Sequence, residues 1–314
     1  MKVFLTGATG FVGQELAKKV IAAGHVLFAA IRQANVSLHE DIKTFVVDDI
    51  VSQCWGEALA GKEVVIHCAA RAHVMNDEST DPLAVFRKVN VDGTLNLARQ
   101  AAEAGVKRFI FISSIKVNGE ETECGKPYAA DDTPAPIDPY GISKLEAEQG
   151  LLALAAETGM EVTIIRPVLV YGPGVKGNFA SMINLVEKGI PLPLGSIHNK
   201  RSLVGIDNLV DLIIRCIDHP AAANQVFLAG DGEDLSTTQL LRSVAKAMGR
   251  PARLIPVSTG LLQFGATLLG KKAMAQRLLG SLQVDISKTR ELLGWTPPVS
   301  VEEGLKRCFF AGKD

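Results

Sequence analysis

Apolar residues in the first half of the chain gather into short continuous runs, separated by stretches with helical spacing. Runs without polar alternation are typical of strands in a parallel sheet that helices cover on both faces. The pattern predicts strands at residues 2–6, 26–31, 43–47, 63–68, 108–113 and 161–166, and helices at 11–23, 83–104 and 140–157. Gly24 and Gly105 mark the ends of the first two helices. This alternation indicates an α/β fold with a doubly wound parallel sheet.

Proline and glycine break the second half into loops and shorter elements. Helices are predicted at 209–217, 237–248 and 261–269, and a strand at 226–228. We therefore expect a larger α/β domain over residues 1–172, completed by about 201–230. A smaller C-terminal α/β cap, formed by 173–200 and 231–314, would cover the mouth of the sheet. The apolar stretch 261–269 is expected to be a core or lid helix, and contact with a membrane or a partner is the alternative.

Charge and composition exclude several classes of protein. The 314 residues include 33 Lys and Arg against 34 Asp and Glu, a net charge of −1, which gives no overall attraction to nucleic acid or to an acidic membrane surface. No run of about 18 uncharged apolar residues is present, so no integral membrane segment is expected. No secretory signal or CxxC motif is present either, so a cytoplasmic protein with reduced thiols is expected. The six histidines offer no spaced ligand set, so no metal site is expected and His67 is interpreted as structural.

Three glycines follow the first predicted strand and open the first helix. In this context Gly7 permits a tight turn, Gly10 lets the backbone approach a pyrophosphate, and Gly13 lets the helix pack close to the strand. Free backbone N–H groups at the helix start, around Phe11 and Val12, would face the phosphates. The sequence therefore predicts a dinucleotide site, with a glycine turn used only for packing as the alternative.

The residues after the second and third strands bear on which dinucleotide is bound. An NAD site usually has an acidic residue about 20 residues after the glycines, but Ile31 holds that place and Arg32 follows it. An arginine suits a 2′-phosphate, so NADP(H) is slightly favoured over NAD(H), with a surface arginine as the alternative. Asp49 and Ile50 are predicted to meet the adenine edge, unless Asp49 only starts a loop.

Candidate catalytic groups come from the tyrosines. Of the three tyrosines, only Tyr140 has a lysine four residues on, Lys144, and at this spacing both side chains lie on one helix face. An ammonium nearby, together with an oxidised nicotinamide, would lower the pKa of the phenol towards neutrality. Such a phenol exchanges a proton while a hydride moves at the adjacent carbon. Ser113 and Ser114, which end the preceding strand, are predicted to hydrogen-bond the same oxygen.

These residues together resemble the extended short-chain dehydrogenase/reductase family, in particular its nucleotide-sugar epimerases, dehydratases and reductases. The matching segments are TGATGFVG at 6–13, HCAA at 67–70, VNVDGTLNL at 89–97, FISSIKVNG at 111–119, YGISKLEAE at 140–148, RPVLVYGPG at 166–174 and LLGW at 292–295. The resemblance implies a Rossmann fold with a C-terminal substrate-binding cap. It implies Tyr140 as general acid/base, Lys144 as its tuning partner on the nicotinamide ribose, and Ser114 as the group that aligns the reacting oxygen. Further cofactor contacts are implied at Ala69, Ala70, Asn90, Ser113 and Pro167.

The same resemblance implies a UDP-sugar substrate. Asn178 and Arg201 look like the residues that bind the diphosphate, and Arg277 is a weaker candidate for a second phosphate contact. His73 and Lys116 are candidate contacts to the sugar. Relatives suggest a homodimer that pairs through the helices at 83–104 and 140–157.

Two reactions at C4 of the sugar fit these residues. A reductase would use NADPH to reduce a 4-keto sugar, and an epimerase would retain NAD and return the hydride to the other face. Segments such as SSIKVNG and NKRSLVGIDNLVDL resemble bacterial enzymes of surface-polysaccharide biosynthesis, including lipopolysaccharide biosynthesis. A 4,6-dehydratase is disfavoured because Ile115 and Lys116 stand where those enzymes have an acid pair. A non-catalytic NAD(P)-binding redox sensor is the alternative from another class.

Overall fold

The computed structural model describes residues 1–33, 38–72 and 81–310. At its centre lies a seven-stranded sheet in the order β3-β2-β1-β4-β5-β6-β9, in which every neighbouring pair is parallel. The chain therefore winds outward from β1 to one edge and then crosses over to β4, which confirms the doubly wound sheet. The strands are β1 (Lys2–Thr6), β2 (Val26–Ile31), β3 (Lys43–Val46), β4 (Val64–His67), β5 (Arg108–Ile112), β6 (Glu161–Pro167) and β9 (Gln225–Ala229).

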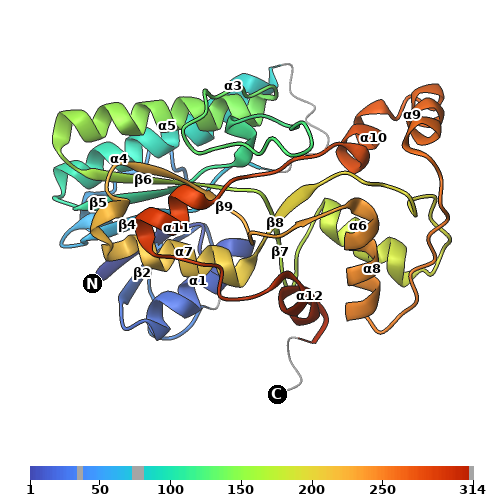
Figure 1. Ribbon diagram of the computed structural model, residues 1–314. Helices are drawn as coiled ribbons and strands as arrows, with labels where there is room; N and C mark the ends of the chain where they lie inside the picture. Colours follow the sequence, from blue (N-terminus) through green and yellow to red (C-terminus); the bar gives the residue numbers. More distant parts are fainter. Residues whose placement is uncertain (34–37, 73–80, 311–314) are drawn as a thin grey trace.

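Helices cover both faces of this sheet, as its apolar strands require (Figure 1). One face is packed by α1 (Phe11–Ala22), α7 (Ile206–Asp218) and α11 (Ser287–Leu293), which bury side chains such as Leu16 and Ile213. The other face is packed by α2 (Gly56–Leu59), α4 (Thr94–Glu103) and α5 (Pro139–Thr158), with Leu97 and Leu151 fully buried. The two apolar layers fix the plane of the sheet and leave the strand ends free to build a site.

The predicted helix at 83–104 is not one continuous α-helix. It consists of α3 (Pro82–Arg87), a π-helical turn η1 (Lys88–Gly93) and α4. Asp81 caps the start by accepting a hydrogen bond from the backbone N–H of Ala84 at 3.0 Å. A π-helical turn inserts one residue into the helix and is frequent at functional sites. Here it contains Asn90, one of the predicted cofactor residues.

The C-terminal part builds a second, three-stranded sheet that the sequence did not predict. Its strands are β7 (Leu169–Tyr171), β8 (Arg201–Gly205) and β10 (Asp234–Leu235), in the order β10-β8-β7. Three helices pack on it, namely α6 (Asn178–Glu187), α8 (Thr237–Ala247) and α12 (Val301–Phe310), and only α8 among them was predicted. Short 3-10 turns, η2 (Ile115–Val117) and η3 (Pro220–Ala222), complete the connections.

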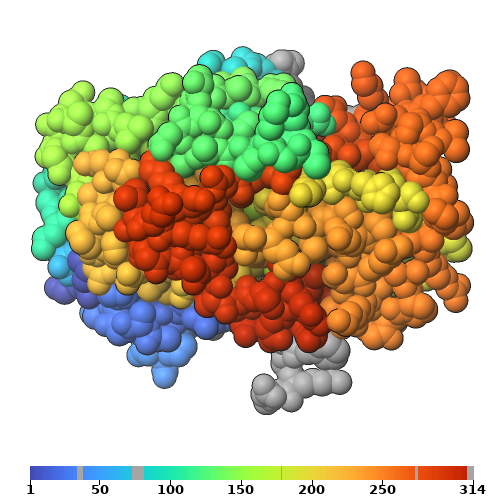
Figure 2. All heavy atoms as spheres, in the orientation of Figure 1, coloured from blue at the N-terminus to red at the C-terminus, as the bar shows by residue number. Residues whose placement is uncertain are grey.

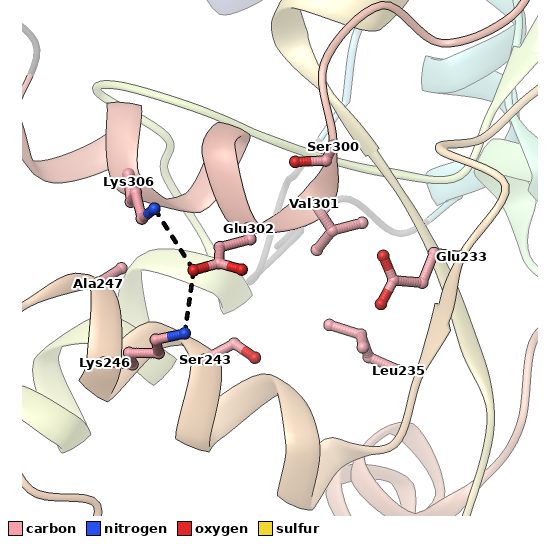
Figure 3. Close-up of a pocket in the computed structure, with 9 residues that line it drawn as sticks. All are labelled: Glu233, Leu235, Ser243, Lys246, Ala247, Ser300, Val301, Glu302 and Lys306. Carbon is pink, nitrogen blue, oxygen red and sulfur yellow. Dashed lines mark hydrogen bonds and ion pairs between the residues drawn. The ribbon is translucent and has the colours of Figure 1, made fainter.

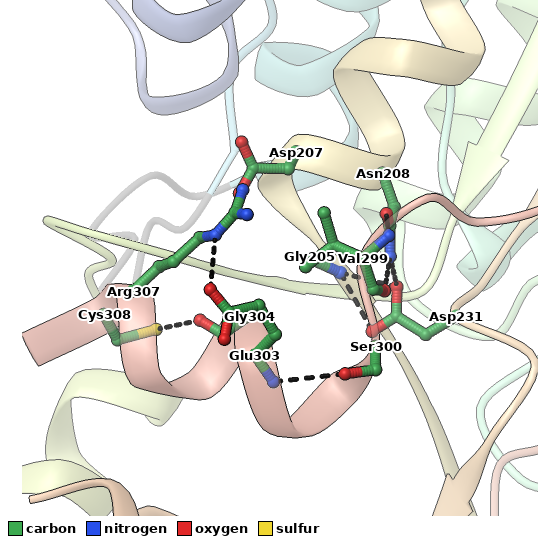
Figure 4. A network of polar contacts seen from close by, with 10 residues as sticks. All are labelled: Gly205, Asp207, Asn208, Asp231, Val299, Ser300, Glu303, Gly304, Arg307 and Cys308. Atoms are coloured by element: carbon green, nitrogen blue, oxygen red, sulfur yellow. Dashed lines mark hydrogen bonds and ion pairs between the residues drawn. The ribbon is translucent and has the colours of Figure 1, made fainter.

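A polar network ties the C-terminal helix to the junction of β8 and α7 (Figure 4). The Asp231 carboxylate accepts hydrogen bonds from the Gly205 N–H at 2.9 Å and from Asn208 Nδ2 at 2.7 Å. Asn208 also exchanges hydrogen bonds with the backbone of Val299, just before α12. Arg307 of α12 forms an ion pair with Asp207 of α7 at 3.1 Å. These contacts hold α12 and the residues just before it against the first turn of α7.

The predicted helix at 261–269 forms α9 (Thr259–Leu268), but it is not a core helix; the lid helix and the contact with a membrane or a partner stay predictions. No residue of α9 is buried, and only its inner stripe packs on α10 (Lys272–Leu279). The pair forms a hairpin at the end of the molecule farthest from α4 and α5 (Figure 1). In the described residues, no helix has the length and apolar character needed to cross a membrane.

Candidate active site

The glycine turn after β1 has the geometry that its spacing predicts. Gly7 adopts φ +76°, and a Cβ there would stand 2.7 Å from the backbone nitrogen of Ala69. A Cβ on Gly13 would lie 2.0 Å from the Gly7 carbonyl oxygen, so only glycine lets α1 approach β1 this closely. Gly10 forms the cap of α1 and donates to the Gly7 carbonyl at 2.9 Å. No side chain of the described residues caps α1, and its first turn carries no acidic residue, so its N–H groups suit an anionic phosphate.

The crossover between β1 and β4 brings the other predicted cofactor residues to the same edge. The carboxyl ends of parallel strands meet at one side of the sheet, and the crossover is where such sheets bind dinucleotides. There the exposed Arg32 follows β2, and the partly buried Ala69 follows β4 and donates to Thr6 Oγ1 at 3.3 Å. The same edge also holds Phe11, Val12, Ala70, Ser113, Ser114 and Pro167.

Asp49 has a local structural role. Its carboxylate accepts hydrogen bonds from the Val51 N–H at 3.0 Å and from Ser52 Oγ at 3.3 Å, so it stabilises the turn after β3. Ile50 lies against η1, where a Cβ on Gly93 would stand 2.8 Å from its Cγ2. The aspartate therefore has the local role of a loop-starting residue, and its contact with the adenine edge stays a prediction.

Tyr140 and Lys144 stand one turn apart at the start of α5, after Asp138 and Pro139. Asp138 caps the helix by accepting from the Gly141 N–H at 2.7 Å, which fixes where the first turn begins. The Tyr140 ring contacts Phe86 edge-on, with ring centroids 6.0 Å apart. A hydrogen bond links Tyr140 to Ser114, so the phenol and the hydroxyl meet beside the end of β5.

The protein's own groups raise the pKa of Tyr140, whereas the lower pKa expected from the sequence also involved an oxidised nicotinamide. Burial, with a smaller contribution from the Asp138 carboxylate, raises the pKa of Tyr140 to about 12, and the Ser114 hydrogen bond opposes this only in part. Burial lowers the pKa of Lys144 to about 7. The Lys144 ammonium donates to the Ile112 carbonyl at 2.7 Å and lies 4.1 Å from the Phe111 ring centroid. The lysine is therefore directed at the end of β5, where its ammonium group is hydrogen-bonded to a backbone carbonyl oxygen.

Asn90 has both of its side-chain groups occupied by neighbours. Its Oδ1 accepts from the Arg71 N–H at 2.8 Å, and its Nδ2 donates to the Arg71 carbonyl at 3.1 Å and to Ser143 Oγ at 3.0 Å. Ser143 precedes Lys144 on α5, so Asn90 joins the loop after β4 to the helix that carries the tyrosine. The π-helical turn allows this fully buried side chain to reach both elements.

A buried charged network behind Lys144 is absent from the sequence-based predictions. Glu148 lies one turn after Lys144 and pairs with Arg166 of β6 through Nε at 3.0 Å and Nη2 at 2.6 Å. The two side chains are 2% and 4% exposed. Ser113 Oγ also donates to Glu148, and Arg166 donates to Asn118 Oδ1 at 3.0 Å. The sequence signal that could have predicted this network is the presence of two charged residues, Glu148 and Arg166, among mostly apolar buried positions of α5 and β6.

The predicted substrate residues are more dispersed. Lys116 pairs with Glu120 at 3.1 Å and with Asp138, and Arg201 at the start of β8 donates to the Gly280 carbonyl at 3.0 Å. Burial lowers the pKa of Arg201. Arg277 is exposed on α10 and is not joined to these residues by any described contact. Asn178 begins α6 after Gly177, and His73 lies outside the described residues.

His67 has a structural environment. Its ring nitrogens contact Thr6 Oγ1 at 2.6 Å and Thr94 Oγ1 at 3.0 Å, and burial lowers its pKa to about 3. The described residues contain no group of three or more His, Cys, Asp or Glu side chains placed to hold a metal ion. His67 thus connects β1, β4 and α4 as a neutral ring.

A hollow of about 250 Å³ lies away from the strand ends, between α8 and α12 (Figure 3). Across it, Glu302 pairs with Lys246 at 3.0 Å and with Lys306 at 3.4 Å. None of the predicted catalytic residues lines it. Its lining residues are Glu233, Leu235, Ser243, Lys246, Ala247, Ser300, Val301, Glu302 and Lys306.

Comparison with known proteins shows similarity to epimerases that act on sugar nucleotides. The sequence pattern of the "NAD dependent epimerase/dehydratase family" matches residues 3–230. A Vibrio cholerae protein named UDP-glucose 4-epimerase is 54% identical over 97% of this chain and 93% of its own. An Escherichia coli O157:H7 protein named N-acetyl-alpha-D-glucosaminyl-diphospho-ditrans,octacis-undecaprenol 4-epimerase is 28% identical over the same shares. The structure of a Thermotoga maritima UDP-glucose 4-epimerase with UDP-glucose superposes with a TM-score of 0.77 at 27% identity, over 98% of this chain and 97% of that one.

The glycine turn at the crossover of a parallel sheet defines a Rossmann-type enzyme of the extended short-chain dehydrogenase/reductase class. The comparisons narrow the class further. The chain belongs to the NAD dependent epimerase/dehydratase family and is of its nucleotide-sugar type.

Proposed function

We propose that the protein is an NAD-dependent 4-epimerase of a UDP-sugar. The observation that carries the proposal is the Tyr140–Ser114 pair at the same sheet edge as the Gly7–Gly13 turn. The 54% identity to a protein named UDP-glucose 4-epimerase supports the same reaction. A role in building bacterial surface polysaccharide is part of the proposal and rests on the sequence resemblance.

In this proposal Tyr140 Oη takes the proton of the C4 hydroxyl and later returns it, while Ser114 orients that oxygen by hydrogen bonding. When bound, NAD would supply reversible hydride transfer at C4, with the hydride returned to the opposite face. Lys144 holds the ribose side of the cofactor and adds positive charge beside the phenol. Asn90 keeps α5 in register with the loop after β4, since it bonds both Arg71 and Ser143.

Residues 1–172, with about 201–230, bind the dinucleotide in this proposal, and 173–200 with 231–314 bind the sugar nucleotide. The turn from Gly7 to Gly13 and the N-terminus of α1 receive the pyrophosphate. Arg201 is the main candidate for the substrate diphosphate, since its guanidinium is mostly buried and uses one N–H on a carbonyl. Asn178 and Lys116 are proposed to complete that side of the site.

A second candidate function is a 4-keto reductase that uses NADPH. The specific observation in its favour is Arg32, which is exposed directly after β2 where an NAD site usually has an acidic residue. The two candidates differ in what happens to the cofactor. An epimerase recycles it in place, whereas a reductase consumes it.

Analysis of the bound nucleotide separates these candidates. The purified protein is denatured, released NAD and NADP are quantified, and the native protein is then assayed for interconversion of UDP-glucose and UDP-galactose. Retained NAD with interconversion supports the epimerase, and turnover of NADPH with a UDP-4-keto sugar supports the reductase. A protein that binds dinucleotide but turns over neither class of substrate would refute both and favour a redox sensor.

Tyr140→Phe tests the assigned proton donor. Removing a positioned general acid/base is expected to lower kcat by about 10²–10⁴-fold. Tyr128→Phe is the matched control, because the Tyr128 hydroxyl donates to the Glu121 carbonyl at 2.7 Å outside the proposed site. If Tyr140→Phe keeps the wild-type rate, the catalytic assignment fails.

We also propose a homodimer that pairs through α3, α4 and α5. These helices lie side by side on one face of the sheet (Figure 1). Arg87 and Glu146 join α3 to α5 through a forked ion pair, with the shortest contact at 2.6 Å. Light scattering at micromolar concentration tests the proposal, and a monomer would overturn it.

A further inference from the structure

The α9–α10 hairpin exposes an apolar ridge formed by Leu261, Phe264, Leu268 and Leu269. These side chains are 62%, 63%, 72% and 73% exposed. The first three recur at spacings of three and four residues, so they follow one stripe of α9. Single exposed leucines are ordinary on protein surfaces, whereas a contiguous group of large apolar side chains marks an interaction surface.

The opposite stripe of the same helix explains why the ridge faces outward. Leu262 and Ala266 pack on a small core formed by Ile197, Ala275 and Leu279. The inner stripe therefore fixes the rotation of α9 about its axis, and the ridge is directed away from the protein. The hairpin lies at one end of the molecule (Figures 1 and 2).

The charged side chains of the hairpin itself are all positive. Lys271, Lys272 and Arg277 follow directly along the chain and are exposed, and none of them forms an ion pair with another described residue. The sequence from 235 to 284 contains no Asp or Glu, although the whole chain has a net charge of −1. The hairpin is thus a positively charged region that borders an apolar stripe, in a protein whose overall charge is nearly balanced.

We propose that the α9–α10 hairpin binds the surface of a bilayer that contains anionic lipids. An amphipathic helix with a cationic border lies in the plane of the bilayer interface, with its apolar stripe among the upper acyl chains. Lysine side chains at such a border reach the lipid headgroups with their ammonium groups. The binding is peripheral and reversible and does not depend on the reaction that the site performs.

A second copy of this chain is a poorer occupant of the ridge. A two-fold symmetric contact through the ridge would place Lys271, Lys272 and Arg277 of one copy next to the same residues of the other. Like charges across an interface oppose association, and the hairpin offers no acidic partner for them. An anionic lipid surface satisfies both the apolar and the charged part of the hairpin.

Co-sedimentation of the full chain with vesicles tests the proposal. We expect binding to vesicles of phosphatidylglycerol and phosphatidylcholine at low salt, weaker binding to pure phosphatidylcholine, and release at high salt. Each cation near an anionic surface contributes about fivefold to partitioning, so Lys271→Glu with Lys272→Glu is expected to lower it by at least about 25-fold. Lys18→Glu with Lys19→Glu, a neighbouring exposed pair on α1, is the matched control.

The apolar part is tested with Leu261→Ser, Phe264→Ser and Leu268→Ser combined, which should abolish sedimentation without changing the circular dichroism spectrum. Leu292→Ser on α11 is the control, since Leu292 is 41% exposed. Absence of wild-type binding to anionic vesicles at low salt would overturn the proposal. It would also be overturned if the ridge variants changed only the oligomeric state measured by light scattering.

Discussion

Glu148→Gln is the substitution whose cost the structure predicts most directly. The carboxylate accepts hydrogen bonds from three donor atoms, namely Ser113 Oγ and Nε and Nη2 of Arg166. Glu148 and Arg166 are 2% and 4% exposed, so water cannot replace the lost charge. The substitution keeps the shape of the side chain and one acceptor oxygen, but it leaves the Arg166 guanidinium buried without its countercharge.

Breaking one partner of a buried ion pair costs about 3–5 kcal/mol, because an uncompensated charge stays in the interior. A typical domain has a stability of only about 5–15 kcal/mol, so this loss shifts the unfolding transition substantially. Replacing both partners, as Glu148→Leu with Arg166→Met, removes both charges. Because well-packed apolar replacements of a buried pair are often neutral, the double variant is expected to recover most of the loss.

Urea unfolding followed by tryptophan fluorescence measures this difference, since Trp55 and Trp295 are 1% and 4% exposed. The control is Glu302→Gln, which removes the surface pairs with Lys246 and Lys306 and should leave the midpoint nearly unchanged. The reasoning fails if Glu148→Gln is no more destabilising than the control. It also fails if the double variant is as unstable as the single one.

Three further predictions concern the same sheet edge. Gly13→Ala is expected to abolish dinucleotide retention or folding, because its Cβ would lie 2.0 Å from the Gly7 carbonyl oxygen. Gly56→Ala is the control, since a Cβ there meets nothing within 4 Å. Normal dinucleotide retention in both variants would contradict this prediction. His67 has a pKa of about 3 in the fold against 6.5 in a free side chain, so it contributes a loss of stability as pH falls from 6.5 towards 3. His67→Gln should therefore show a flatter urea midpoint against pH over that range, and an equal slope would contradict the assignment. Lys144 has a pKa of about 7 in the fold against an ordinary value of 10.5. The wild type should therefore gain stability relative to Lys144→Met as pH rises from 7 to 10.5. A difference in unfolding free energy that stays constant over this range would contradict the prediction.

The central sheet was predictable because its strands are buried on both faces and therefore appear as continuous apolar runs. β7 and β10 are only three and two residues long and leave no such signal. Helix α12 also escaped prediction, since its buried positions, Val301 and Leu305, depend on contact with the second sheet. The π-helical turn has an ordinary helical sequence, and its extra residue is set by the hydrogen bonds of Asn90.

The positions of the candidate site residues could be predicted from the sequence, whereas the shifts of their pKa values could not. Spacing along α5 correctly placed Tyr140 and Lys144 one turn apart, and the end of β5 brought Ser114 to the phenol. The lowered pKa expected with an oxidised nicotinamide stays a prediction. The protein's own groups raise the pKa of the phenol, because burial acts on both groups and the sequence shows neither the burial nor the Ile112 carbonyl that engages Lys144.

The two shifts together constrain how Tyr140 works. With a pKa of about 12 the phenol is almost fully protonated at neutral pH, and with a pKa of about 7 Lys144 is only about half charged. The protein alone therefore does not hold a phenolate at neutral pH. A second positive charge beside the phenol is needed to reverse this preference. In the proposed reaction Tyr140 accepts a proton while the sugar loses a hydride, and Lys144, about half charged at neutral pH, supplies only part of the positive charge beside the phenol. The site is therefore suited to proton transfer that is coupled to an oxidised, positively charged dinucleotide.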